Sequence, residues 1–186
     1  AGPVWVDEWA EQVSEDLGIP ILFGNLIFTE EEDHYNGLFS VTPDGGFNEN
    51  FYAKRKLIAY AEYAPFHEIP VLEKLMLGGI NMKAGDSTEP FTMQLNGNDI
   101  HIGGLICYED VFPQFVRESA QKTIDVFVSV SSLGWFGHGA APDQHAAHSV
   151  LRAVETQRPL LRVGNKGISG WIDEIGNVRA ELKDEN

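Results

Sequence analysis

The single cysteine of the chain, Cys107, follows an apolar run at residues 103–106 and precedes Tyr108, two acids and a nearby proline. This pattern predicts a buried strand that ends at the cysteine and continues into a tight turn. Such a turn exposes a thiol at the edge of a sheet, where the following backbone N–H groups stabilise a thiolate and hold an oxyanion. The spacing therefore predicts that Cys107 is a nucleophile.

A reactive thiol needs a nearby cation, and Lys54 is the leading candidate in the sequence. An ammonium group favours the thiolate over the thiol and later stabilises the negative oxygen of a tetrahedral intermediate. Lys54 follows an expected strand end at Tyr52 and opens a segment that contains Glu62. The alternative is a solvated surface lysine, which the neighbouring Arg55 and Lys56 favour.

Simpler interpretations of these and other residues stay open. A lone cysteine in an apolar strand is most often an inert core thiol. Single acids such as Glu62 and Glu109 most often pair with nearby cations. Arg152 and Glu155, three positions apart on an expected helix, suit an ordinary surface pair.

Two histidines on the same expected helix, His145 and His148, are spaced as metal ligands can be, but no third ligand is evident. We therefore predict no metal site, and no motif in the chain indicates a cofactor.

The composition excludes some classes of partner. The chain has 186 residues, of which 13 are basic and 28 acidic, giving a net charge of −15. Nucleic-acid binding relies on basic contacts to phosphates, so we expect no nucleic-acid partner. The hydrophobic fraction of 43% is typical of a globular domain, and no apolar run in the sequence is long enough to span a bilayer.

The elements that must position Cys107 and Lys54 alternate between strands and helices, which favours an α/β fold. Periodicity predicts helices at residues 4–17, 115–122 and 142–157. Apolar or alternating runs predict strands at residues 19–28, 35–41, 51–52, 91–95, 100–106, 124–130, 159–163 and 168–172. The Asn-Gly pair at residues 96–97 indicates a hairpin. The acidic end, residues 182–186, is expected to be frayed.

Five groups of residues occur in a characteristic order. They are LIAYAEYAP (57–65), CYEDVFP (107–113), WFG (135–137), PDQH (142–145), and RAVETQRP with RVGNKGIS (152–159 and 162–169). Together they resemble motifs of the nitrilase (carbon–nitrogen hydrolase) superfamily and, within it, of the bacterial apolipoprotein N-acyltransferases. The resemblance covers most of the chain, and it implies one nitrilase-like domain over residues 1–186, with a four-layer α-β-β-α sandwich fold.

The resemblance also implies a reaction and its location. Cys107 would take an acyl chain from a phospholipid as a thioester, and the N-terminal amine of a diacylglyceryl-cysteine lipoprotein would then attack it. Lys54 would form the oxyanion hole with the backbone N–H after Cys107. The implied setting is the periplasmic side of the bacterial inner membrane, reached through membrane segments outside this chain.

Further roles are carried over from the same resemblance. Glu62 and Glu109 would position and polarise the lysine and the reacting groups. Tyr108 and Trp135 would line a pocket for the acyl chain or the headgroup. The loop at residues 66–83 is expected to be mobile and to contact lipid.

The chain departs from the family pattern in two places. The superfamily's general base is a glutamate in a Trp-Pro-Glu-like segment, to which the region around Glu8 has only a faint likeness. We expect the base upstream of Ala1, with the domain incomplete at the N-terminus and also at the C-terminus. Loss of such a base costs a factor of roughly 10²–10⁴, so this segment alone is expected to be inactive. Residues 132–134 also replace an Asn-Asp pair, which alters the polar support of that loop.

Two rival functions remain open at this stage. A soluble amidase or carbamoylase of the same superfamily would share the cysteine, the lysine and the glutamates but would transfer the acyl group to water. A binding module without catalysis would bury an unreactive Cys107. The segment at residues 59–65 favours the lipid branch over the first rival.

Overall fold

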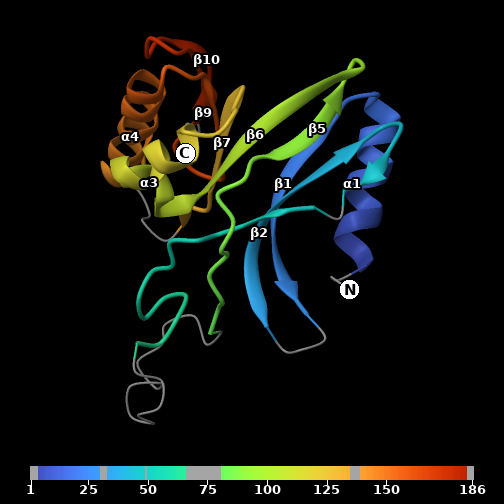
Figure 1. Cartoon of the computed structure of the whole chain (residues 1–186), viewed down its shortest axis with the longest axis horizontal. Helices are drawn as coiled ribbons and strands as arrows, with labels where there is room; N and C mark the ends of the chain where they lie inside the picture. The colour runs from blue at the N-terminus through green and yellow to red at the C-terminus, as the bar shows by residue number, and fades with distance from the viewer. Residues whose placement is uncertain (1–3, 30–32, 49, 66–80, 135–138, 184–186) are drawn as a thin grey trace. The chain divides into compact units, whose positions relative to one another are not determined.

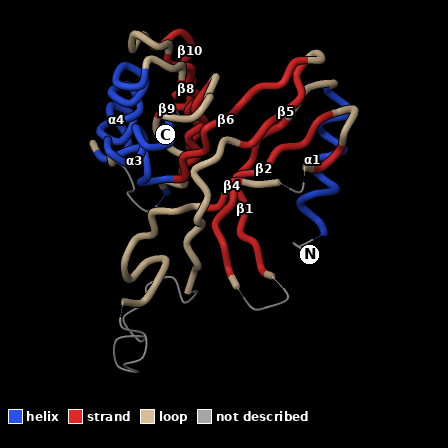
Figure 2. The backbone as a smooth tube through the Cα atoms, viewed as in Figure 1, coloured by secondary structure: helices blue, strands red, loops and turns tan. Residues whose placement is uncertain are grey.

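The structure, a computed structural model, describes residues 4–29, 33–48, 50–65, 81–134 and 139–183. The chain divides into two compact units, Ala1–Ser87 and Thr88–Asn186. Each unit contains one sheet and at least one helix (Figures 1 and 2). The units are described one at a time below.

The first unit is an antiparallel sheet with one described helix, α1, packed against β2 and β3. Its elements are α1 (Val4–Leu17), β1 (Ile21–Phe28), β2 (His34–Thr42), β3 (Gly46–Phe47) and β4 (Tyr52–Ala53). The strand order is β1-β2-β3, and β4 also pairs with β2. Leu38 and Val41 of β2 are fully buried. Helix α1 ends at Leu17, and the φ of 64° at Gly18 suits a glycine directly after a helix.

The second unit is a sheet of six strands in the order β10-β9-β8-β7-β6-β5. Its elements are β5 (Phe91–Leu95), β6 (Asn98–Ile106), the 3₁₀ turn η1 (Cys107–Val111), α3 (Pro113–Ala120), β7 (Val126–Ser131), α4 (Ala141–Thr156), β8 (Leu160–Gly164), β9 (Ile168–Ile172) and β10 (Val178–Lys183). The central strands β6, β7 and β8 run parallel, and the outer pairs are antiparallel.

The core of the second unit lies between its sheet and the helices. Helix α4 packs against β8, β9 and α3. The buried cluster there contains Leu105, Val116, Phe127, Ala153 and Leu160. Residues 102–106 at the end of β6 are buried in this sheet, and Cys107 follows them directly.

The hairpin between β5 and β6 forms where the sequence predicts it. Asn96 and Gly97 both adopt positive φ, 52° and 76°. Positive φ at both central residues is what a two-residue type I′ turn requires, and Asn-Gly is its preferred pair. The turn therefore sets the register of β6, the strand that leads to Cys107.

The predicted helices and strands are confirmed, with two corrections. Residues 182–186 are expected to be frayed, but 182 and 183 end strand β10, where Leu182 pairs with Ser169 and Lys183 with Ile168 of β9. Val178 and Leu182 of β10 are exposed, so the strand is held by its backbone pairing with β9 rather than by burial. Strand β1 was expected to be buried, but most of its side chains are half-buried.

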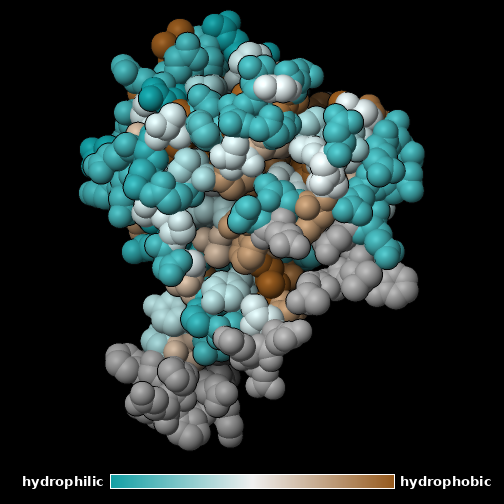
Figure 3. All heavy atoms as spheres, turned by 45° about the vertical axis from the view of Figure 1, so that its right-hand side comes forward, coloured by the Kyte–Doolittle hydropathy of each residue, from teal (hydrophilic) through white to brown (hydrophobic). Residues whose placement is uncertain are grey.

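The molecular face shown in Figure 3 is mostly hydrophilic. This agrees with the excess of 28 acidic over 13 basic residues.

Candidate active site

Cys107 stands at a sharp turn between β6 and η1, as its sequence context predicts. Its φ is 55°, a left-handed conformation that is uncommon for a residue with a side chain. Such strain persists only where the surroundings enforce it, and it concentrates at functional sites. The cysteine is half-buried.

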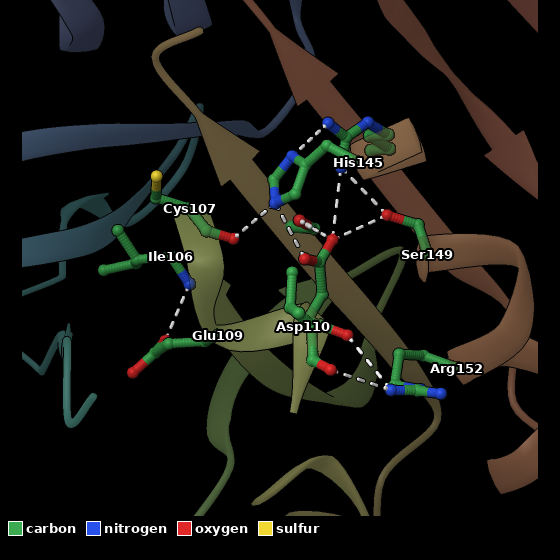
Figure 4. A network of polar contacts seen from close by, with 10 residues as sticks. Ile106, Cys107, Glu109, Asp110, His145, Ser149 and Arg152 are labelled. Atoms are coloured by element: carbon green, nitrogen blue, oxygen red, sulfur yellow. Dashed lines mark hydrogen bonds and ion pairs between the residues drawn. The ribbon is translucent and has the colours of Figure 1, made fainter. Parts of the chain in front are cut away.

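Glu109 supports this turn from inside. Its side chain is fully buried, and Oε2 accepts a hydrogen bond from the Ile106 backbone N–H at 2.7 Å (Figure 4). A glutamate that reaches back to the residue before a helical turn satisfies a donor that the turn leaves free. Glu109 therefore holds together the end of β6 and the start of η1.

Tyr108 presents an aromatic surface beside the cysteine. Its side chain is 43% exposed, and its ring meets Phe112 edge to face with centroids 5.4 Å apart. Trp135 and residues 66–80 of the expected lipid-contacting loop lie outside the described residues.

A buried polar network lies beneath the turn, centred on Asp110. Its Oδ2 accepts hydrogen bonds from Ser149 Oγ at 2.7 Å, Arg162 Nη1 at 3.2 Å and Ser129 Oγ at 3.3 Å. Arg162 Nη1 also donates to Ser149 Oγ at 2.9 Å. The buried carboxylate thus gains both a cationic partner and hydroxyl donors, which a buried charge requires.

Arg162 is the cation of this network and is 2% exposed. Burial lowers the pKa of the guanidinium below its usual range, while the negative charges of Asp110 and Cys107 oppose that shift. Arg162 is therefore placed to interact electrostatically with the cysteine as well as with Asp110.

His145 reaches the cysteine through the backbone. Its Nε2 lies 3.1 Å from the Cys107 carbonyl oxygen, and its Nδ1 lies 2.7 Å from Arg162 Nη2. In Figure 4 the carbonyl oxygen points toward His145 and the sulfur points away from it. His145 is thus not arranged as a base for the thiol.

Arg152 corrects the expectation of an ordinary surface pair. It does pair with Glu155 at 3.0 Å, but Arg152 is buried. Its Nη1 donates to the carbonyl oxygens of Asp110 at 3.3 Å and Val111 at 3.4 Å (Figure 4). The arginine therefore holds η1 against α4.

The loop that departs from the family pattern is supported by Asn165. Its Oδ1 accepts from the Leu133 N–H at 2.7 Å, and its Nδ2 donates to Ser132 Oγ at 3.0 Å. The altered residues at 132–134 therefore keep polar support from β8's exit.

In the first unit, Lys54 is 1% exposed and pairs with Glu62. Its Nζ donates to both carboxylate oxygens at 2.6 Å. Glu62 also accepts from the Ile58 N–H at 2.9 Å and from Asn36 Nδ2 at 3.4 Å. The interpretation of Lys54 as a solvated surface lysine is wrong, because the ammonium is buried and fixed.

The backbone at Lys54 is held on both sides. Lys54 N–H donates to the Asn36 carbonyl at 2.8 Å, and Gly85 N–H donates to the Lys54 carbonyl at 2.9 Å. A Cβ on Gly85 would lie 2.5 Å from the Ala53 carbonyl oxygen. Only a glycine allows the chain to pass this close to the end of β4.

Lys54 and Glu62 are therefore brought together in the first unit, and Cys107, Tyr108 and Glu109 in the second. A pairing of Cys107 with Lys54 would need one residue from each unit and stays a prediction.

Sequence reasoning missed the roles of Asp110, His145, Ser149 and Arg162. One signal was present: His145, Ser149 and Arg152 recur at spacings of four and three, which places them on one face of α4. That face packs against η1.

Across the described ranges, no group of three or more His, Cys, Asp or Glu side chains is arranged to hold a metal ion. Among the same residues, no helix combines the length and apolar character needed to cross a bilayer.

The strained turn at Cys107, the buried residues that hold it and the two sheets can now be compared with known families of proteins. Residues 1–186 match the profile of the carbon–nitrogen hydrolase family. The chain belongs to this family, which confirms the resemblance seen in the sequence.

Two relatives show which members of this family the chain is similar to. The chain is 36% identical over 150 residues to the apolipoprotein N-acyltransferase of Bdellovibrio bacteriovorus, covering 80% of this chain and 27% of the relative. It is 35% identical over 149 residues to that of Rickettsia prowazekii, covering 80% and 29%. The chain thus spans between a quarter and a third of the length of these relatives.

Solved structures confirm the fold class. An amidase from Nesterenkonia sp. aligns with a TM-score of 0.71 at 18% identity, over 97% of this chain and 63% of the amidase. A nitrilase-superfamily protein from Saccharomyces cerevisiae aligns with a TM-score of 0.69 at 18% identity, over 97% and 62%. The chain therefore has the predicted α/β fold of the nitrilase type.

Proposed function

We propose that this chain is the catalytic domain of an apolipoprotein N-acyltransferase. The domain would move an acyl chain from a phospholipid to the N-terminal amine of a diacylglyceryl-cysteine lipoprotein. The observation that carries the proposal is the 36% identity over 80% of the chain with a protein of that name. The strained turn at Cys107 adds the chemical feature that such a transfer needs.

Cys107 is the nucleophile in this proposal. The thiolate attacks the ester carbonyl of the phospholipid, a C–S bond forms, and the ester C–O bond breaks to release a lysophospholipid alcohol. The lipoprotein amine then attacks the thioester, so that a C–N bond forms and the C–S bond breaks. A general base carries the proton of the thiol to the leaving alcohol, then takes the proton of the attacking amine and returns it to the Cys107 sulfur.

Lys54 stabilises the negative oxygen of both tetrahedral intermediates. Glu62 binds the ammonium through both carboxylate oxygens, at 2.6 Å each, and so fixes its direction. The backbone N–H of Tyr108 is the second oxyanion donor. Removing one such donor costs roughly 10²–10³ in kcat.

The remaining roles follow from the family resemblance. Glu109 holds the turn, and the exposed ring of Tyr108 is assigned to the pocket for the acyl chain or headgroup, as is Trp135 on its motif alone. We place the domain on the periplasmic side of the bacterial inner membrane, within a longer protein whose other segments enter the bilayer. The domain covers residues 1–186. We expect no nucleic acid, metal or cofactor in this reaction.

The decisive experiment follows a labelled acyl chain. The full-length protein, in vesicles containing a phospholipid with an isotopically labelled acyl chain, should form a thioester on the Cys107 peptide, detected by mass spectrometry. A lipopeptide with a free amine should discharge it. Cys107→Ser should abolish the thioester and the transfer. N-acylation that survives this substitution removes Cys107 from the mechanism.

A second experiment tests the meeting of Cys107 and Lys54. Iodoacetamide should alkylate the wild-type thiol rapidly at neutral pH. Lys54→Met should slow the reaction about 10-fold or more, because a neighbouring cation favours the thiolate. Lys56→Met, a change of the same kind at an exposed lysine, should leave the rate unchanged. Equal alkylation rates in all three proteins would show that Lys54 does not act on the Cys107 thiol.

The fold likeness to an amidase supports a second candidate, hydrolysis of a small C–N bond. Incubation with labelled small amides and with labelled phospholipid distinguishes the two. Transfer to water from small amides alone supports the amidase. A thiol that reacts only after denaturation supports a module without catalysis.

A further inference from the structure

The contacts of His145 determine where its proton lies. A guanidinium N–H can only donate, and Arg162 Nη2 lies 2.7 Å from Nδ1. Nδ1 must therefore accept with its lone pair, which makes the ring neutral and places its proton on Nε2. A proton on Nδ1 would put two donors face to face at that distance.

The Nε2–H has one well-directed acceptor, the Cys107 carbonyl oxygen at 3.1 Å. Asp110 Oδ1 is also close, at 2.9 Å from Nε2, but among the described residues it receives no hydrogen bond that meets normal geometry. The N–H is thus aimed at the backbone of the cysteine. His145 is 8% exposed, so little water competes for this bond.

Fixing this carbonyl also fixes the next N–H. A trans peptide group is planar, with its C=O and N–H pointing in opposite directions. The Cys107 carbonyl points toward His145, so the Tyr108 N–H of the same peptide group points the other way. The Cys107 sulfur also points away from His145 (Figure 4). The hydrogen bond therefore turns the Tyr108 N–H toward the side on which the thiol lies.

We propose that His145 is a positioning residue: in its Nε2–H tautomer, selected by Arg162, it anchors the Cys107 carbonyl and thereby aims the Tyr108 N–H at the developing oxyanion. This inference rests on the proposed acyl transfer at Cys107. It assigns the histidine a role through the backbone rather than as a base, and it makes Arg162 the residue that sets the tautomer.

Asp110 and Arg162 make this anchor rigid. Arg162 contacts His145 through Nη2 and Asp110 through Nη1, so a single guanidinium binds both. The same arginine thus orders both the histidine and the carboxylate that lie beside the turn.

The test compares two substitutions of His145 in the full-length protein. His145→Gln keeps an amide N–H near the position of Nε2, whereas His145→Asn is too short to place one there. His148→Asn, the same change three positions further along α4, is the control. Acyl transfer is measured as thioester formation on Cys107, and thiol reactivity is measured with iodoacetamide, whose reaction develops no oxyanion.

We expect His145→Asn to slow thioester formation roughly 10²-fold, the scale of one oxyanion donor, and to change the alkylation rate less than about threefold. His145→Gln should recover most of the loss, and His148→Asn should match the wild type. Equal losses in alkylation and acylation, or no recovery with glutamine, would overturn the positioning role.

A measurement that needs no catalytic reaction tests this inference independently of the proposed function. Solid-state NMR of protein labelled with ¹³C-carbonyl cysteine and ¹⁵N-tyrosine selects the Cys107–Tyr108 peptide group, and ¹⁵N-histidine reports the tautomer. Both signals should shift in His145→Asn and stay near wild type in His145→Gln. A proton on Nδ1 in the wild type overturns the inference. If the wild type has the expected tautomer but forms no thioester, the positioning of the Cys107 carbonyl by His145 stands and the proposed acyl transfer is refuted.

Discussion

The two units hold their buried charges in opposite ways. In the first unit, Lys54 is bound by the two oxygens of Glu62, a compact pair whose ammonium keeps donor capacity for another group. In the second unit, Asp110 and Arg162 share their contacts with Ser149 and His145, and these contacts stabilise the turn. One unit therefore presents a charge, whereas the other uses charges to shape the backbone that carries a thiol.

The largest expected effect comes from breaking the compact pair. Glu62→Gln leaves the ammonium of Lys54 buried without its counter-charge, which costs about 3–5 kcal/mol in the free energy of unfolding. Replacing both residues, with Lys54→Met and Glu62→Leu, should restore most of the stability. Urea unfolding measures both proteins.

The matched control is Asp33→Asn, which breaks the more exposed pair of Asp33 with Lys83 in the same unit. Its cost should stay below about 1 kcal/mol. A similar cost for Glu62→Gln and Asp33→Asn would contradict the burial of the Lys54 charge.

A smaller effect is expected from the glycine that lets Lys54 take its place. Gly85→Ala puts a Cβ 2.5 Å from the Ala53 carbonyl oxygen, and the required backbone shift should cost about 1–3 kcal/mol. Gly139→Ala, with no atom within 4 Å of its added Cβ, should be neutral by comparison. Urea unfolding of both variants decides the point, and equal midpoints would show that the close pass is not needed.

Ser149→Ala tests whether the network of the second unit is redundant. The hydroxyl donates to Asp110 at 2.7 Å and accepts from Arg162 at 2.9 Å, but Asp110 and Arg162 still contact each other without it. We therefore expect a loss of about 1 kcal/mol, well below that of Glu62→Gln. Ser129→Ala, which removes a longer bond of 3.3 Å to the same oxygen, should cost less. A loss in the free energy of unfolding as large as that of Glu62→Gln would show that the network of the second unit is no more redundant than the ion pair of the first.

The smallest effect concerns Asp173, a carboxylate held at a turn without a buried cation. Burial alone would raise its pKa, but hydrogen bonds from Asn177, Arg179 and Ile175 outweigh burial and lower the pKa to about 2. Because the folded pKa lies below the unfolded value of about 3.9, the stabilisation is complete above that value and is lost as the pH falls through about 2. NMR titration of the carboxyl carbon measures the pKa, and unfolding of Asp173→Asn should lose this part of the pH dependence. A carboxyl that titrates near 4 would refute the assignment.

The fold was largely predictable from local patterns. The apolar run before Cys107, the Asn96-Gly97 turn and the apolar face of α4 each depend on neighbours a few positions away. Strand β10 escaped prediction because its stability comes from backbone pairing with β9 rather than from burial. The end of β6 at Cys107 and the hairpin were both predictable because each depends on a turn directly next to a strand pattern.

The candidate site was predictable in part. Cys107, Lys54 and Glu62 stand in recognisable motifs, and the pairing of Lys54 with Glu62 spans eight positions. The surface-pair interpretation of Arg152 failed because periodicity cannot tell which helix face packs against η1.

The types and order of neighbouring residues in the sequence were enough to indicate a thiol at a strand end and to identify the family. The network behind that thiol was not accessible in this way. Asp110 and Arg162 are 52 positions apart, and His145 lies 38 positions from Cys107. Their contacts exist only because η1, α4 and β8 pack together in one core, and packing depends on the three-dimensional path of the chain rather than on any stretch of it.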